Sequence, residues 1–487
     1  LSKQGKRVIL VTKETSPDDI HGMSAAAGLL TARGGRTSHA AVVGRQMGKV
    51  CVVGAEEIKV NIKNRNFSVK DKLIHEGDYI SIDGFEGKVY KGDIPVVASE
   101  VIQVMQGDMK EIASERYGIF STILKWADSF KRLKIRTNAD VPVDAEIAIK
   151  FGAEGIGLCR TEHMFFAEDR IKIMQDMILS TDTNSRIKEL NKLQEMQKKD
   201  FVGLFTAMKG FPCTIRLLDP PLHEFLPKRE DLMLEVKELE ILDNNPDELR
   251  KKKALLDRVE ELHEFNPMLG LRGCRLGITM PEITRMQVRA IFEAAIEVQK
   301  KKIKVLPEIM VPLVSMVTEI KFQKDIINDV AREVLGKKKI NYMVGTMIEV
   351  PRAAAVADQI AKEAEFFSFG TNDLTQTVFA FSRDDAGQII NTYMETKVEL
   401  DDKKVEILSK DPFTSIDING VGEFMKMGYE KGKNTRKSLK VGICGEHGGD
   451  PQSIEFCHKI GLDYVSCSPF RVPIARLAAA RVALDDD

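Results

Sequence analysis

Residues 343–349 read MVGTMIE, and residues 366–373 read FFSFGTND. Each stretch begins with a short apolar run and ends with polar side chains that could bind a ligand or take part in catalysis. Short apolar runs bounded by polar residues are typical of strands that are covered on both faces of a parallel sheet. We expect such strands at residues 135–138, 155–159, 214–218, 308–313, 343–348, 366–369, 441–444 and 464–467. Helix-like stretches separate them, so the pattern predicts an α/β protein built on a (β/α)8 TIM barrel.

Working outward from these strands, the chain divides into three parts. Residues 132–487 would form the barrel, and residues 1–95, with shorter apolar runs and frequent turn signals, would form a small α/β domain. Residues 96–131 have few glycines and place apolar side chains at helical spacing, which predicts a helical linker. Two excursions interrupt the barrel: residues 228–264 are charged and predicted helical, and residues 390–420 are predicted to form a loop.

Composition excludes several classes of protein. Of 487 residues, 43% are hydrophobic and 30% are charged, which is the balance of a globular chain. The net charge of −1 gives no electrostatic reason to expect nucleic acid or a membrane surface as a partner. Seven cysteines are too few and odd in number for a disulfide framework, which favours a reducing, cytoplasmic compartment. The chain begins with Leu1, so we expect a piece of a longer protein whose upstream part could carry an organellar address.

Polar side chains stand where several predicted strands end. They are Arg160, Arg216, Glu349, Asp373 and Cys444. One such residue alone is more often part of a structural ion pair. The C-terminal ends of barrel strands meet at one mouth, however, so several strands would deliver these groups to a single place.

The chemistry of the set is consistent. Forked guanidinium groups match phosphate oxygens, and two carboxylates are hard oxygen ligands suited to Mg²⁺. Asn372 can donate to an anionic oxygen, and the thiol of Cys444 can donate a proton near neutrality. The sequence therefore predicts a site for a small phosphorylated carboxylic acid bound with a metal.

In the small domain, residues 34–39 read Gly-Gly-Arg-Thr-Ser-His. Two glycines allow a tight turn, and Thr37 or Ser38 can cap the helix that we expect to follow. His39 would then lie in the first helical turn, where free backbone N–H groups favour an anion and a neutral imidazole. A lone histidine is usually structural, but this surrounding string favours a phosphohistidine.

These strings resemble a known family. Residues 34–54 are similar to the phosphohistidine domain of the phosphoenolpyruvate-utilising enzymes. Residues 157–166, 216–225, 266–270 and 442–449 resemble the pyruvate, phosphate dikinase branch of that family, and the likeness covers nearly the whole chain. The resemblance implies a swivelling N-terminal phosphohistidine domain beside a barrel that binds phosphoenolpyruvate and pyruvate.

The resemblance also implies roles for individual residues. His39 would carry the phosphoryl group, and Arg160, Arg216 and, with weaker support, Arg272 would hold that group on the barrel. The remaining implied roles are Mg²⁺ ligation by Glu349 and Asp373, binding of the substrate carboxylate or enolate by Gly370, Thr371 and Asn372, and protonation of the methylene carbon by Cys444.

The implied overall reaction interconverts phosphoenolpyruvate, AMP and diphosphate with pyruvate, ATP and phosphate. This chain shows no glycine-rich nucleotide-binding loop, so it would carry only the phosphoenolpyruvate half-reaction. ATP, AMP, phosphate and diphosphate would enter through an N-terminal half that the sequence lacks, and the family suggests a homodimer. The alternatives are a phosphoenolpyruvate synthase, the enzyme I of sugar transport, or a regulatory phosphoprotein without turnover. The acceptor of the phosphoryl group would distinguish a dikinase from the synthase and from enzyme I.

Overall fold

The computed structural model describes residues 5–15, 19–35, 38, 40–41, 44, 48–97, 99–242, 245–383, 385–400 and 403–486. His39, the predicted phosphocarrier, lies outside the described residues. The helix that we expected over residues 40–47 lies largely outside them as well.

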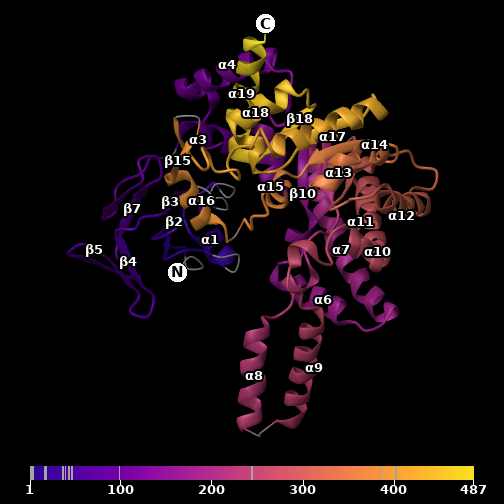
Figure 1. Cartoon of the computed structure of the whole chain (residues 1–487), viewed down its shortest axis with the longest axis horizontal. Coiled ribbons are helices and arrows are strands. Elements are labelled where there is room, and N and C mark those ends of the chain that lie inside the picture. The colour runs from indigo at the N-terminus through magenta and orange to yellow at the C-terminus, as the bar shows by residue number, and fades with distance from the viewer. Residues whose placement is uncertain are drawn as a thin grey trace.

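Eight parallel strands close into a barrel, so the predicted TIM barrel is confirmed (Figure 1). In barrel order the strands are β9 (Lys134–Asn138), β10 (Ile156–Arg160), β11 (Pro212–Arg216), β12 (Leu306–Val311), β13 (Met343–Ile348), β14 (Phe366–Phe369), β17 (Lys440–Ile443) and β18 (Tyr464–Cys467). Each overlaps a strand that the apolar runs predicted. In a closed parallel sheet covered by helices, almost every strand residue is buried, which makes the apolar signal strong.

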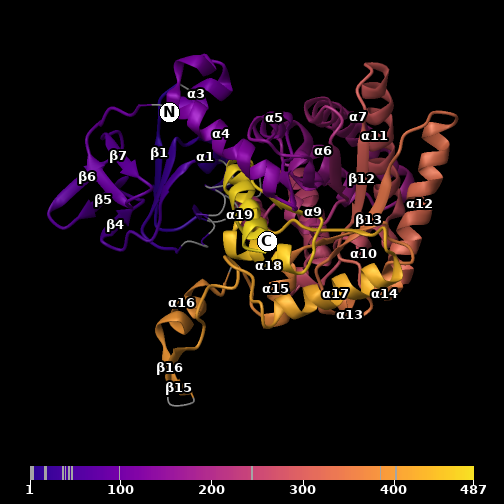
Figure 2. The ribbon, with the colours of Figure 1, turned by 90° about the horizontal axis from the view of Figure 1, so that it is seen from above.

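Helices surround the barrel (Figure 2). They include α5 (Pro142–Lys150), α7 (Thr183–Met208), α11 (Pro281–Lys300), α12 (Val317–Leu335), α17 (Val421–Thr435), α18 (Pro451–Lys459) and α19 (Val472–Asp485). In α11, Val288, Ile291, Phe292 and Ala295 recur at helical spacing and are fully buried. This stripe is what holds the helix against its neighbours, because propensity alone stabilises a helix only weakly.

The described residues of the N-terminal domain form three small sheets. Strands β1 (Ile9–Thr12), β2 (Gly28–Thr31) and β3 (Val50–Val52) are parallel, and β7 (Ile80–Asp83) and β8 (Lys88–Lys91) form a hairpin. Short apolar runs at residues 8–11, 28–30, 50–53, 79–82 and 88–90 predict these five strands. Sequence patterning missed the antiparallel sheet of β4 (Ile58–Asn61), β5 (Asn66–Val69) and β6 (Lys72–His75). Only Ile58, Phe67 and Ile74 of that sheet are buried, one per strand, so no apolar run marks it.

Two α-helices lie within the described part of residues 96–131, where the sequence predicts helical structure. They are α3 (Glu100–Gln106) and α4 (Glu115–Phe130). Ser114 caps α4 by accepting a hydrogen bond from the backbone N–H of Tyr117 at 3.0 Å. Helix α4 packs against α19, the last helix of the barrel.

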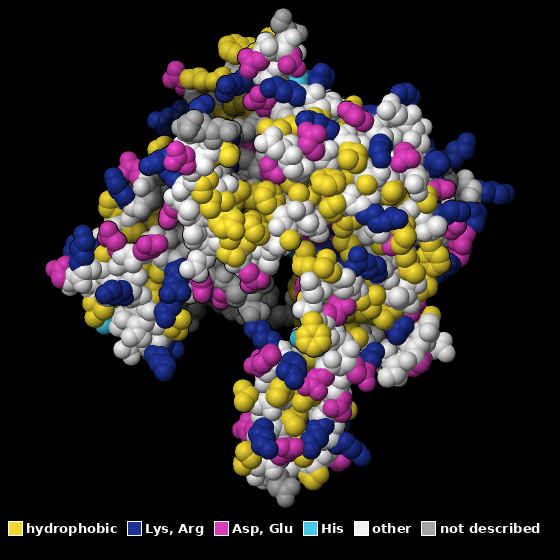
Figure 3. Space-filling view, in the orientation of Figure 1, with side chains coloured by type: hydrophobic (Ala, Val, Ile, Leu, Met, Phe, Trp, Pro, Cys, Tyr) yellow, Lys and Arg dark blue, Asp and Glu magenta, His cyan; other side chains and the backbone are white. Residues whose placement is uncertain are grey.

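The first excursion, residues 228–264, was predicted to be helical, and the structure confirms this with two helices that form a hairpin. Helices α8 (Arg229–Leu242) and α9 (Pro246–Leu262) project from the barrel (Figure 1). Side chains of both charge signs are interleaved over the hairpin surface (Figure 3), and cross-helix ion pairs join Lys252 to Glu235 at 2.6 Å and Lys253 to Glu240 at 2.8 Å. The many charged residues of this segment therefore form a solvent-exposed surface.

The second excursion is not the loop that we expected. It contains α16 (Gly387–Glu395) and an antiparallel hairpin of β15 (Lys397–Leu400) and β16 (Lys403–Glu406) that extends away from the barrel (Figure 2). Opposite charges face each other across this hairpin, with Lys397 3.4 Å from Glu406. Neither strand has a buried residue, so apolar patterning could not indicate them. Within the described residues, no helix combines the length and apolar character needed to cross a membrane.

Candidate active site at the barrel mouth

The structure brings the predicted side chains to one end of the barrel. Arg160 and Arg216 are the last residues of β10 and β11, and Glu349 and Cys444 directly follow β13 and β17. Gly370 follows β14 and precedes α15 (Thr371–Phe379). Because the strands are parallel, their C-terminal ends surround the same opening.

Two of the three arginines are held by carboxylates. Arg216 forms ion pairs with Glu162 and, at 2.6 Å, with Asp219. Arg272 lies 2.5 Å from Asp219 and 3.0 Å from Asp373. Burial favours neutral groups, but Asp219 raises the pKa of both arginines, and the arginines in turn lower the pKa of Asp219. Asp219 is therefore an anion that joins the two guanidinium groups.

The third arginine differs from the other two. Within the described part of the chain, the side chain of Arg160 has no hydrogen-bond or ion-pair partner, although its backbone N–H donates to Asp140 at 2.6 Å. Its positive charge is therefore available to an anionic ligand at the mouth.

Two carboxylates complete the same network. Glu349 is 1% exposed, and its Oε1 accepts a hydrogen bond from the backbone N–H of Leu313 at 2.6 Å. Leu313 has a φ of 57°, a left-handed conformation that is costly for a branched side chain and aims this N–H at Glu349. Burial, and then repulsion from Asp373 and Asp219, raise the pKa of Glu349 to about 8, although Arg216 and Arg272 oppose the rise.

This pair of carboxylates fits a divalent cation. Asp373 Oδ2 is buried without a hydrogen bond of good geometry, even though Arg272 is near. A buried carboxylate oxygen without a partner and a neighbouring carboxylate of raised pKa are both stabilised by a cation. No group of three or more ligating side chains occurs among the described residues. Two carboxylates are nevertheless sufficient for Mg²⁺, which commonly takes its other ligands from water and substrate.

The first turn of α15 borders the pair. A Cβ on Gly370 would lie 2.8 Å from Cβ of Glu349, so only glycine fits there. Thr371 Oγ1 is 2.7 Å from His447 Nδ1, and Asn372 Oδ1 accepts from the backbone N–H of Glu446 at 3.2 Å. These bonds orient Asn372 so that its amide N–H₂ group, which has no partner in the described chain, remains available as a donor.

Cys444 is buried, although the glycine-rich turn of residues 445–449 that follows it in the sequence predicts a thiol exposed at the mouth. Its side chain is fully buried, in contact with the apolar side chains Leu158, Met310, Met347 and Phe366 inside the barrel. The residue immediately follows β17, below the turn at Glu446–Gly449, so its side chain points into the barrel instead of outward. Burial raises the pKa of the thiol to about 11, and therefore the thiol keeps its proton.

Four residues of this site did not emerge from the strand-end argument. Glu162 and Asp219 hold Arg216, and Asp140 joins the backbone of Arg160 to the ring of His163. In the sequence, Glu162 and Asp219 follow the arginines by two and three residues, inside the strings that carry the family resemblance. Acidic residues at that spacing are common, so the spacing alone could not single them out.

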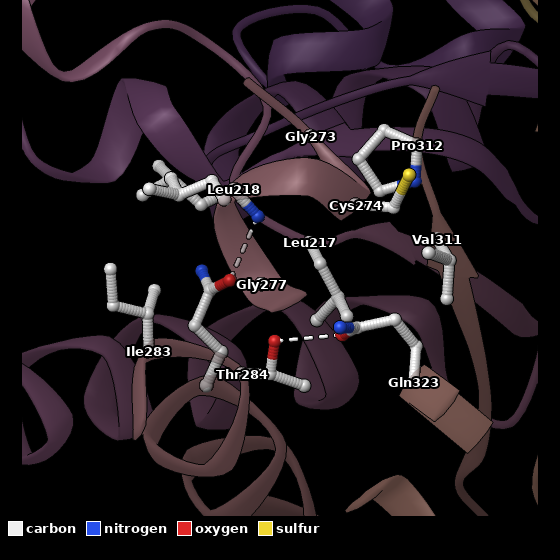
Figure 4. A pocket seen from close by; sticks show the side chains of 12 residues that line it. Leu217, Leu218, Gly273, Cys274, Gly277, Ile283, Thr284, Val311, Pro312 and Gln323 are labelled. Carbon is white, nitrogen blue, oxygen red and sulfur yellow. Dashed lines mark hydrogen bonds between the residues drawn. The ribbon is translucent and has the colours of Figure 1, made fainter. Parts of the chain in front are cut away.

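A small cavity lies behind the arginines and is separate from the mouth. Its volume is about 10 Å³, enough for one water molecule. Figure 4 shows its lining, in which Leu218 N–H donates to Gln287 at 2.8 Å and Thr284 donates to Gln323 at 2.8 Å. None of the charged side chains of the mouth lines it, so it supports the wall of the site and holds no substrate.

Comparison with known proteins agrees with this architecture. Residues 114–484 match the PEP-binding domain of PEP-utilising enzymes, and residues 4–87 match the mobile domain of the same enzymes. The chain is 53% identical to pyruvate, phosphate dikinase of Clostridium symbiosum, over 99% of this chain and 52% of that protein. It is 52% identical to chloroplastic pyruvate, phosphate dikinase 1 of Arabidopsis thaliana, over 99% of this chain and 47% of that protein. The chain thus spans about half the length of these relatives, and it belongs to the family of PEP-utilising enzymes.

Proposed function

We propose that the chain transfers a phosphoryl group between phosphoenolpyruvate and His39, with pyruvate as the other product. The observation that carries this proposal is the composition of the mouth. Arg160, whose side chain has no partner among the described residues, stands in the same site as the buried Glu349 and the partly buried Asp373, in a domain whose family binds phosphoenolpyruvate.

The substrate would bind through both of its acidic groups. Arg160 receives the phosphoryl oxygens, and Arg216 and Arg272, already oriented by Asp219, complete the cationic side of the site. Asn372 and the backbone around Gly370 and Thr371, at the start of α15, bind the carboxylate or enolate oxygen.

Glu349 and Asp373 would hold Mg²⁺, which supplies positive charge against the oxygens of the substrate. Glu349 must lose its proton for this role. A cation beside it lowers the pKa that burial raises, so metal binding and deprotonation are coupled.

The reaction then requires two steps, a phosphoryl transfer and a proton transfer. A ring nitrogen of His39 attacks phosphorus as the bond from phosphorus to the enol oxygen breaks, and the electron pair of that bond remains on the enolate. Cys444 gives the thiol proton to the methylene carbon, which yields pyruvate, and solvent returns a proton to the thiolate. The buried, protonated thiol beneath the mouth supports this role.

The larger reaction is also a proposal. Relatives named pyruvate, phosphate dikinase are about twice as long. In a protein of that length, AMP, ATP, phosphate and diphosphate would react with His39 elsewhere, after the carrier domain of residues 1–95 swings about the linker of residues 96–131. We propose further that residues 132–487 form the phosphoenolpyruvate-binding domain and that two copies associate as a homodimer.

The direct test is acid-labile labelling of His39. The chain is incubated with phosphoenolpyruvate labelled in its phosphoryl group and with Mg²⁺, and the phosphorylated residue is mapped. We expect label on His39 and none after the substitution His39→Asn. Normal labelling of His39→Asn would refute the proposal and direct attention to His163. His447 is a poor alternative because it is fully buried and bonded through both ring nitrogens, to Thr371 and Pro412.

A further inference from the structure

Two histidine–aspartate pairs of equal separation occur in the described chain. Asp140 lies 2.8 Å from Nδ1 of His163 at the barrel mouth, and Asp486 lies 2.8 Å from Nε2 of His458 near the C-terminus. His458 is 1% exposed, whereas the side chain of His163 is 46% exposed. The first pair faces solvent beside the candidate site, and the second is structural.

Asp140 makes two bonds that link His163 to the substrate-binding arginine. One oxygen, Oδ2, contacts His163 Nδ1, and the other, Oδ1, accepts the backbone N–H of Arg160 at 2.6 Å. With Nδ1 held, Nε2 is the only ring nitrogen of His163 left for a ligand, and it has no partner within the described residues. The ring is therefore both oriented and available.

The groups around His163 favour its charged form. Burial lowers the pKa of its ring, but Asp140 more than offsets this effect, and Glu162 raises the pKa further, against Arg160. Asp140 itself stays ionised, because His163 and Arg160 lower its pKa against burial. These neighbours come from several elements: Asp140 follows β9, Arg160 ends β10 and Glu162 lies in the turn that contains His163, while Asp144 of α5 interacts with Asp140.

Arg160 is the arginine of the mouth whose charge no carboxylate shares within the described residues, so a second cation next to it would strengthen phosphate binding. Arg216 and Arg272 are already paired with carboxylates, and a phosphate monoester carries close to two negative charges near neutral pH. We propose that His163 is a further phosphate-binding residue, held by Asp140 as its positioning residue, and that its Nε2–H and proton-dependent charge act with Arg160 on the phosphoryl group of the substrate. The inference rests on the proposed function.

The experiment measures binding of two unreactive probes by calorimetry between pH 6 and pH 9 with Mg²⁺. Phosphonopyruvate carries a phosphoryl group that cannot be transferred, and oxalate resembles the enolate but carries no phosphorus. The proteins are the wild type, His163→Asn and Asp140→Asn, with Asp486→Asn as the matched control. Asparagine at position 163 keeps a donor toward Asp140 and removes Nε2 and the charge.

For each protein, the readout is its Kd divided by that of the wild type at the same pH, because this ratio cancels ionisation of the probe. For His163→Asn and phosphonopyruvate, we expect a ratio of about ten at pH 6, the size of one charge-assisted hydrogen bond, that declines toward one at pH 9. Asp140→Asn should lower the pKa of His163, so its ratio should exceed one only between the pKa of His163 in the variant and the higher pKa in the wild type. Oxalate ratios and all Asp486→Asn ratios should stay near one.

Each result decides a different point. A flat ratio of one for His163→Asn, with tight wild-type binding, would overturn the role of His163 and leave the proposed function intact. A wild type that binds neither probe would instead refute the proposed function. Equal weakening of oxalate and phosphonopyruvate would show a structural defect and would also overturn the inference. If His163→Asn fails to fold, His163→Arg provides the second test, since a permanent charge should give tight binding that no longer depends on the protonation of residue 163.

Discussion

Glu308 and Glu349 lie at opposite ends of the same barrel, and both are almost completely buried, at 2% and 1% exposed. Their protonation differs. At the N-terminal end, burial raises the pKa of Glu308 but Arg136 and Lys440 more than offset it and bring the pKa to about 2. At the mouth, burial and neighbouring carboxylates raise the pKa of Glu349 to about 8. The comparison shows that local partners, not depth, decide whether a buried carboxyl group is charged.

Both carboxylate oxygens of Glu308 have protein partners, so this group needs no ligand to stabilise its charge. It receives hydrogen bonds from Arg136 and Thr214, each at 2.7 Å, and pairs with Lys440. Arg136 also lies 4.1 Å from the centre of the Tyr464 ring. Among the residues that the structure describes, Glu349 accepts one hydrogen bond, and the carboxylates of Asp373 and Asp219 repel it. One end is therefore built for stability, and the other keeps unsatisfied charge for a substrate and a metal.

The largest effect is expected from Glu349→Gln. The substitution keeps size and shape but removes a ligand of the metal, so phosphoryl transfer should fall by about a thousandfold, as expected for the loss of several kcal/mol of charge stabilisation. Stability at pH 8 should not fall, because a buried group that resists ionisation is replaced by a neutral one. Single-turnover transfer and thermal unfolding check the two statements. Retained transfer would remove Glu349 from the site.

The substitution Glu308→Gln, at the N-terminal end of the barrel, should lower stability and leave phosphoryl transfer unchanged. Glu308→Gln leaves Arg136 buried without its counterion, and we expect a loss of about 3 kcal/mol in the free energy of unfolding. Phosphoryl transfer per folded molecule should be unchanged. Denaturant unfolding and transfer assays on the folded fraction measure both. A normal unfolding free energy would show that the ionic cluster adds no net stability.

The stabilisation from Glu308 and that from Glu349 should change in opposite directions with pH. The pKa of Glu308 is lowered from 4.5 to about 2, so its stabilisation is present above pH 4.5 and is lost as pH falls through 2. That difference corresponds to about 3 kcal/mol. The pKa of Glu349 is raised, so its stabilisation is present below pH 4.5 and is lost as pH rises through 8. Unfolding of each glutamine variant across pH should flatten one limb only, and identical profiles would contradict the comparison.

Cys444 lies in the apolar layer between the two ends. If it is the proton donor, Cys444→Ser should fold normally but lose about a hundredfold in pyruvate formation and in exchange of pyruvate methyl protons with deuterated water. A hydroxyl is too weak an acid to replace the thiol. Phosphorylation of His39 needs no such proton and should persist. Full exchange in the folded variant would assign the proton to another group.

The smallest effect is expected at Lys440. Its side chain is 28% exposed, and Arg136 would still neutralise Glu308 after the substitution Lys440→Met. We expect a loss of about 1 kcal/mol in the free energy of unfolding, as for a partly solvated ion pair. Denaturant unfolding of Lys440→Met beside Glu308→Gln tests this ranking. A loss as large as that of Glu308→Gln would mean that Lys440, not Arg136, is the main partner.

Sequence patterning was most successful where burial is continuous. The eight barrel strands and the α8–α9 hairpin were predicted, because buried strands and long helices leave strong periodic signals. The β15–β16 hairpin and the sheet of β4 to β6 were missed, because few or none of their side chains are buried. The convergence of Arg160, Arg216 and Glu349 followed from strand order alone, since parallel strands end at one edge.

The sequence by itself thus determined the barrel and the set of residues at its mouth, because these depend on apolar periodicity and on which residue ends each strand. The tertiary structure alone decided how each residue is paired and charged. It joined Arg216 to Glu162 and Asp219, left the Arg160 side chain without a partner among the described residues, placed Cys444 inside the barrel and linked Asp140 to His163. Protonation and pairing depend on distances between side chains from different strands and on exclusion of water, and neither can be read along a chain.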